Sequence, residues 1–178
     1  MKNISRLVLL FIVSLTTVSF GQDKERKPMA SPKAEVMQTI GVTDITVTYH
    51  RPAVKERTIW GELVPYDKVW RAGANNATKI EFSNDVTVQG KPLSGGAYSF
   101  FLIPSKTGEW TAIFNTVADQ WGAYNYDESK DALRIKVRPQ ESDHTERLHY
   151  QFTHLTENSA HLVMKWEKIA LAIEIAEK

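Results

Sequence analysis

Three arginines and two tryptophans lie close together in the chain, between positions 51 and 71. They are Arg51, Arg57, Trp60, Trp70 and Arg71. A guanidinium group offers a planar set of donors that fits a carboxylate, phosphate or sulfate, and it also stacks on aromatic rings. These residue types indicate a pocket for a small anionic or glycan ligand, or for a loop of a partner protein, with the rings as stacking platforms.

Two flanking residues extend this candidate site. Tyr49 precedes the first arginine and adds a ring, and Asn75 follows the last one with an amide that both donates and accepts hydrogen bonds. The alternative is that each arginine is used internally, by Glu62, by Asp67 or by backbone carbonyls, and that the tryptophans belong to the core. The sequence leaves both interpretations open.

A second aromatic cluster follows later in the chain. It consists of Trp121, Tyr124 and Tyr126, beside Gly122 and Asn125. Aromatic side chains in a loop with small and polar neighbours suit stacking against a sugar, because each ring has an apolar face and a polar edge. We include Trp121 and Tyr124 among the ligand-binding candidates, with a lid folded over an exposed sheet as the alternative.

A catalytic role has weaker support in the sequence. Tyr49, His50 and Glu62, with an arginine stabilising negative charge, would suit a hydrolase or lyase of envelope glycan or peptidoglycan. The sequence contains no Gly-x-Ser-x-Gly, Walker or His-Glu-x-x-His motif. We assign no catalytic residue and expect binding rather than catalysis, with a purely structural or assembly role as a third alternative.

The sequence does not indicate a metal or cofactor site. His144, His149 and His154 recur every five residues, and this spacing places successive side chains on opposite faces of a strand. The chain has no cysteine, which excludes thiolate metal sites and disulfides. We therefore expect no metal and no cofactor.

The N-terminus has the pattern of a signal peptide, which we assign to residues 1–21. Lys2 and Arg6 precede a fourteen-residue apolar stretch, and small residues flank the expected cleavage point before Gln22. As a helix this stretch rises only about 21 Å, against a hydrocarbon core of roughly 30 Å. We expect cleavage, a mobile leader over residues 22–32, a periplasmic or secreted protein, and no stable membrane insertion.

The charge balance argues against nucleic acid as a partner. The chain has 22 basic and 21 acidic residues, and two of the basic residues lie in the expected signal peptide. The mature chain would have no excess of positive charge to release counterions from nucleic acid. The oligomeric state is not indicated.

Residues 33–178 have the pattern of successive strands. Apolar side chains alternate with polar ones in most segments, for example at Ile45, Val47 and Tyr49. Turn residues separate the segments, and no long helical stripe occurs. We predict one all-β domain, an antiparallel two-sheet sandwich or flattened barrel of about nine to ten strands. The run Ile169–Ile175 is predicted as a strand, although its alanines would tolerate a helix.

The candidate arginines lie where the alternation stops, between Arg51 and Thr78. Pro52 is expected to end the preceding strand. Ile59 and Val64 are among several apolar residues in this stretch, and burying each contributes about 1.5–3 kcal/mol against an ordering cost of about 1–2 kcal/mol. We predict one long ordered loop that packs across the sheet and brings the three arginine side chains to a common place.

The chain resembles domain-of-unknown-function family 2911. The resemblance is carried by the runs Tyr49–Gly61, Val69–Asn75 and Gly96–Ser99, with shorter matches elsewhere between Ser31 and the C-terminus. It implies an exported bacterial protein of a kind found mainly in Bacteroidota. It implies no activity.

Overall fold

The computed structural model describes residues 27–178, which form two antiparallel β-sheets. The predicted signal peptide and the first part of the expected leader lie outside the described residues. The six-stranded sheet has the order β1-β2-β3-β6-β7-β8, with β1 (Lys33–Ile40), β2 (Thr43–His50), β3 (Thr78–Phe82), β6 (Gly96–Ile103), β7 (Trp110–Asn115) and β8 (Asp131–Val137). The four-stranded sheet has the order β5-β4-β10-β9, with β4 (Val86–Val88), β5 (Lys91–Leu93), β9 (Gln140–Thr153) and β10 (Ser159–Glu177).

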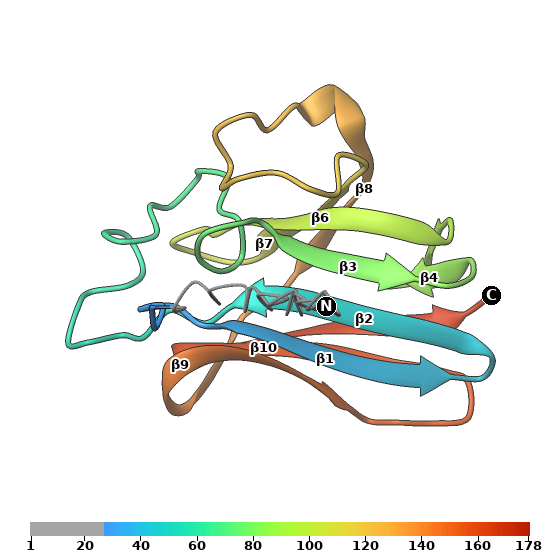
Figure 1. Ribbon diagram of the computed structural model, residues 1–178. Coiled ribbons are helices and arrows are strands. Elements are labelled where there is room, and N and C mark those ends of the chain that lie inside the picture. The colour runs from blue at the N-terminus through green and yellow to red at the C-terminus, as the bar shows by residue number, and fades with distance from the viewer. Residues whose placement is uncertain (1–26) are drawn as a thin grey trace, which may run out of the picture.

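The two sheets pack face to face, as Figure 1 shows. Alternation places Ile45 and Val47 of β2 in the core from one side, and Ile173 and Ile175 of β10 from the other. The predicted ten-strand sandwich is confirmed, and the flattened barrel is wrong because the strands form two separate sheets. The described residues include no helix long and apolar enough to span a membrane.

Strand β6 has both faces covered, as its continuous apolar sequence predicts. Phe100 and Leu102 face the main core, whereas Phe101 faces a smaller cluster with Ala77 and Ile113. A loop after β7, which ends in the short 3-10 helix η1 (Glu128–Lys130), covers this second face. The loop's Tyr126 meets Phe101 edge-on, with ring centroids 5.2 Å apart.

One segment differs in structure from what its residue types indicate, and one predicted strand is part of a longer strand with a bulge. Lys91 and Pro92 have the residue types of a turn, but they belong to β5, which pairs with β4. The run Ile169–Ile175 is a strand as predicted, and it is continuous with the residues before it as part of β10. Within β10 a bulge at Glu167 interrupts the alternation of side chains. The φ of Glu167 is 55°, and the register with β9 shifts on both sides of it.

The long loop over residues 51–77 covers one end of the sandwich and joins the two sheets (Figure 1). β2 ends at His50, as Pro52 predicts. Trp70 of the loop and Leu102 of β6, in the six-stranded sheet, exchange two backbone hydrogen bonds of 2.7 and 2.8 Å. On the other side, the backbone N–H of Leu148 in β9 donates to the carbonyl of Pro52 at 3.0 Å. The loop is thus ordered by backbone bonds to both layers.

Candidate functional site

Four indole rings pack together where the loop meets the sheets, and we call them the tryptophan cluster. Trp60 and Trp70 come from the loop, Trp110 from β7 and Trp166 from β10. The ring of Trp60 lies 4.8 Å from Trp110, 5.7 Å from Trp70 and 5.8 Å from Trp166, and Trp70 stacks on Trp166 at 5.7 Å. Trp70 is buried, so the cluster is chiefly core.

A pocket of about 290 Å³, which we call the loop pocket, opens beside this cluster. Besides Trp70, three residues that the sequence indicated as ligand-binding candidates line the pocket, namely Arg57, Arg71 and Asn75. The residues that line it include Ser31, Arg57, Trp70, Arg71, Asn75 and Trp166. The loop therefore brings two of the three arginines and Asn75 to one place. Among residues 27–178, no aspartate or glutamate lines this pocket.

Arg57 is held by the backbone of its own turn. Its Nε donates to the carbonyl of Val54 at 3.0 Å, and its Nη2 donates to the carbonyl of Ala53. These carbonyls orient the guanidinium but carry no charge to neutralise it. The residue is exposed, so its positive charge remains available at the pocket.

Arg71, like Trp166 in the same pocket, has a buried side-chain donor for which residues 27–178 provide no acceptor. Its Nε is buried and has no hydrogen-bond partner among the described residues. Its backbone carbonyl accepts from the N–H of Thr78 at 3.1 Å, which fixes the chain at the start of β3. A charged donor left without an acceptor costs about 1–3 kcal/mol or more, so such groups are uncommon outside functional sites.

Arg51 and Tyr49 lie outside the loop pocket. The Nε of Arg51 donates to the carbonyl of Leu148 at 3.0 Å and so ties the end of β2 to β9. Tyr49 is buried, its ring meets Tyr150 edge-on at 4.8 Å, and its hydroxyl oxygen accepts from the Tyr150 N–H at 3.2 Å. Only two of the three arginine side chains therefore share the expected common place.

Asn75 connects the pocket to segments far away in sequence. Its φ is 57°, a left-handed conformation that asparagine tolerates well. Its side-chain Nδ2 donates to the carbonyl of Ser31 at 3.3 Å, and its backbone carbonyl accepts from the N–H of Gly122 at 3.1 Å. The amide proposed for ligand binding thus already holds the segment before β1.

The second aromatic cluster lies next to the first candidate site. Trp121 pairs with Asn76 in an isolated β-bridge, and the N–H of Ala77 donates to the carbonyl of Gln120 at 3.0 Å. Trp121 is 59% exposed and Tyr124 is 80% exposed. No local sequence pattern indicates this neighbourhood, because it depends on pairing between two loops about forty-five positions apart.

The ion pairs of the described chain do not involve the candidate arginines. Arg134 pairs with Asp131 and Glu128, and Lys79 pairs with Glu81 at 3.2 Å. The internal alternative thus holds for the tryptophans, which are chiefly core, and for bonds from arginines to backbone carbonyls, but not for Glu62 or Asp67. Arg51 and Arg57 bond to backbone carbonyls, and within residues 27–178 neither Glu62 nor Asp67 pairs with an arginine.

The three catalytic candidates are not brought together. Tyr49 is in the core, and Glu62 is exposed and does not line the loop pocket. His50 lines a different pocket of about 250 Å³ with Lys33 and Lys79. Burial, followed by the charge of Lys33, lowers the pKa of His50 from its ordinary value of 6.5.

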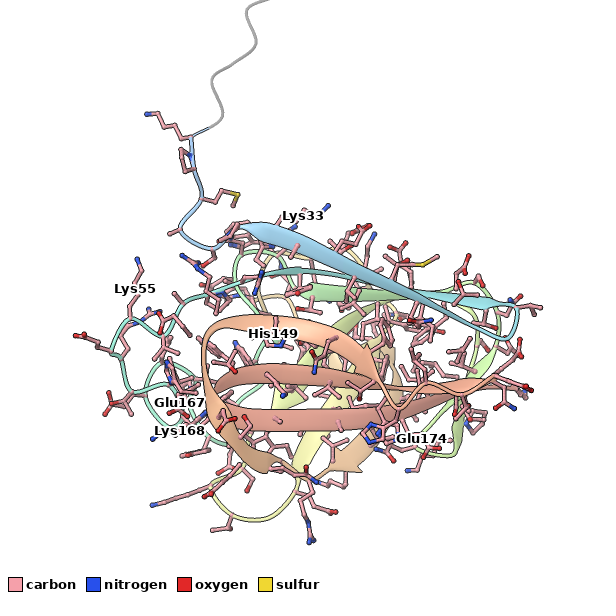
Figure 2. The ribbon with its side chains drawn as sticks, turned by 90° about the horizontal axis from the view of Figure 1, so that it is seen from below. Lys33, Lys55, His149, Glu167, Lys168 and Glu174 are labelled. Atoms are coloured by element: carbon pink, nitrogen blue, oxygen red, sulfur yellow. The ribbon has the colours of Figure 1, made fainter. Side chains whose placement is uncertain are left out.

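The histidines of the described chain are dispersed. His144 lies 3.4 Å from Glu146, His154 stacks on His161 at 4.7 Å, and His149 stands on β9 in Figure 2. Across residues 27–178, no three histidine, aspartate or glutamate side chains gather closely enough to hold a metal ion.

Several residues of the site were not candidates from sequence. Trp110 and Trp166 fit alternating strands, and Ser31 precedes the first strand. Their types carry no signal that separates a pocket wall from ordinary core. They are found only through the contacts that the loop makes with β7 and β10.

Comparison with known proteins supports one conclusion about identity. The model of a family of proteins of unknown function, DUF2911, matches residues 31–175 and thus all the pocket residues above. No curated protein and no solved structure matches the chain. The resemblance seen in the runs Tyr49–Gly61 and Val69–Asn75 is confirmed, and the chain belongs to the DUF2911 family.

Proposed function

We propose that this is an exported, non-catalytic binding protein whose loop pocket takes a small anionic ligand or the acidic group of a glycan. The observation that carries the proposal is the side chain of Arg71. It lines the pocket beside Arg57, its Nε is buried without an acceptor among the described residues, and no carboxylate lines the pocket. A bound anion would supply the missing acceptor and the missing negative charge.

The size of the pocket limits the ligand. Its volume of about 290 Å³ is at the lower end of the roughly 300–1,000 Å³ that is typical of ligand pockets. This suits one carboxylate, sulfate or phosphate group with the atoms that carry it. The exposed rings of Trp121 and Tyr124 lie on the neighbouring loop, where the rest of a glycan would find a stacking surface.

The test is calorimetric titration of the protein with three separate probes: inorganic phosphate, sulfate and glucuronate. We expect one of them to bind, and we expect Arg71→Met to weaken that binding at least tenfold, since hydrogen bonds to charged groups contribute about 1.5–3 kcal/mol. Lys136→Met, which removes an exposed cation of β8 outside the pocket, is the matched control and should bind normally. Absence of binding by all three probes, or equal binding by Arg71→Met, would overturn the proposal.

Export is supported by the sequence of residues 1–21. The measurement is the intact mass of the protein recovered from the periplasm and medium of a Gram-negative host. We expect a chain that begins at Gln22. A full-length chain that stays in the cytoplasm would contradict export without affecting the binding proposal.

A further inference from the structure

A second and larger cleft, which we call the hairpin cleft, lies on the other side of the tryptophan cluster. Its volume is about 540 Å³. The residues that line it include Trp60, Tyr66, Ser105, Lys106, Trp110 and Arg138. The hairpin cleft and the loop pocket share no lining residue, since Trp60 and Trp110 line the cleft and Trp70 and Trp166 line the pocket.

The aromatic walls of the hairpin cleft are held in place by the surrounding chain. The rings of Trp60 and Trp110 lie 4.8 Å apart at an angle of 57°. The Nε1 of Trp110 donates to the carbonyl of Ser105 at 3.1 Å and fixes the turn between β6 and β7. The ring of Tyr66 packs so closely on Gly61 that a Cβ there would lie 2.9 Å from it. The cleft is thus formed before any ligand arrives.

The charged residues of the hairpin cleft are all positive. Lys106 from the β6–β7 turn and Arg138 from the segment after β8 line it, and no aspartate or glutamate of residues 27–178 does. Neither cation forms an ion pair within the described part of the chain. On a protein with almost equal numbers of acidic and basic residues, this is a local excess of positive charge beside the partly exposed rings of Trp60 and Tyr66, whereas Trp110 is buried.

We propose that the hairpin cleft is a second binding site, for an acidic oligosaccharide such as a chain of uronic acids. The rings of Trp60 and Tyr66 are partly exposed and present apolar surface to sugar rings, and Lys106 and Arg138 bind the carboxylates that such a chain repeats. The cleft is more open than the loop pocket and its lining is partly polar, which suits a hydrated sugar chain better than an apolar aromatic molecule. This site is independent of the loop pocket.

The five tryptophans provide a direct test. In a ¹⁵N-labelled protein each indole N–H gives its own NMR signal, and Trp60→Phe and Trp110→Phe assign the two signals of the cleft. Titration with trigalacturonate should shift these two signals, and a neutral oligosaccharide of three hexoses should bind much more weakly. Lys106→Met and Arg138→Met should each weaken trigalacturonate binding about tenfold.

Variants of the loop pocket separate the two proposals. Arg71→Met should leave the titration of the cleft signals unchanged. The cleft proposal is overturned if trigalacturonate shifts only Trp70 and Trp166, if the neutral oligosaccharide binds equally well, or if no indole signal moves. Because Lys106 and Arg138 are exposed, their replacement should leave the thermal transition unchanged, so loss of binding reports on recognition and not on folding.

Discussion

At the level of single residues, Arg51 and Arg71 differ in role although both belong to the same loop. Arg51 donates to Leu148 and connects the two sheets, whereas the Nε of Arg71 has no acceptor among residues 27–178. A satisfied donor contributes to the stability of the fold, and an unsatisfied one reduces it. The structure therefore separates structural from functional candidates, which share one residue type in the sequence.

This difference predicts opposite results for the same substitution. Arg51→Met should lower the free energy of unfolding by about 1–2 kcal/mol, because the carbonyl of Leu148 loses its charged donor. Arg71→Met should keep the aliphatic packing and leave stability unchanged or raise it by up to about 1–3 kcal/mol, because it removes a charged donor that has no acceptor within the described chain. Urea denaturation of the ligand-free protein measures both. A large loss of stability in Arg71→Met would show that this residue holds the fold and would remove the basis of the binding proposal.

A buried tyrosine anchors the loop to the second sheet. The hydroxyl of Tyr150 donates to the carbonyl of Ala72 at 2.8 Å, and burial raises its pKa far above the ordinary range. Tyr150→Phe should cost about 1 kcal/mol, since the carbonyl of Ala72 still accepts from Thr78. Urea denaturation is the measurement, and Tyr124→Phe, at an exposed position, is the control. Equal stability of wild type and Tyr150→Phe would show that this bond does not anchor the loop.

At the level of elements, the loop after β7 depends on one carboxylate. Asp131 accepts from Tyr126 at 2.5 Å, from Arg134 at 2.8 Å and from Asn115 at 2.8 Å. Burial, followed by the hydrogen bond to Asp131, raises the pKa of Tyr126. This network holds the loop that carries Trp121 over the second face of β6.

Removing that carboxylate should loosen the whole loop. Asp131→Ala leaves the hydroxyl of Tyr126 without its acceptor and removes one acceptor from Asn115 and one from Arg134, so it should cost about 1–3 kcal/mol. Glu128→Ala is the control, because its carboxylate is 74% exposed and such surface pairs contribute little. Amide hydrogen exchange over residues 116–130 should rise in Asp131→Ala alone. Unchanged exchange there would contradict the assigned role.

At the scale of the whole molecule, two half-buried histidines couple folding to pH. Burial, followed by the charge of Lys33, lowers the pKa of His50. Burial is also the largest cause that lowers the pKa of His149, to which the charges of Arg51 and Lys165 add, while a hydrogen bond with the Arg147 backbone opposes them. The folded protein therefore disfavours the protonated form of both side chains.

The sign of the pH dependence follows from these shifts. Below the ordinary pKa of 6.5 the unfolded chain binds more protons than the folded one, so stability falls as the pH decreases through 6.5 towards the lowered values. We expect a lower free energy of unfolding at pH 5 than at pH 7.5, and a smaller difference in the His149→Gln variant. Urea denaturation at the two pH values measures this. Greater stability at pH 5 would contradict the assignment.

The strands and their faces were predictable from sequence because alternation is a local property. Ile45, Val47 and Tyr49 face the core by their spacing alone, and the continuous apolar run of β6 indicated its two covered faces. The bulge at Glu167 and the short strand β5 were not predictable, because pairing with neighbouring strands determines them. The need to bury apolar groups likewise predicted an ordered loop between β2 and β3.

The composition of the two pockets was decided only by the tertiary structure. Arg57 and Arg71 meet at one pocket while Arg51 does not, and Trp60 lines a different cleft from Trp70 although both belong to the same loop. These outcomes depend on contacts with β7, β9 and β10, which lie far away in sequence. A residue's type and spacing determine whether it is buried in a strand, but packing between distant segments determines whether its charge is satisfied, and therefore whether it remains free to bind.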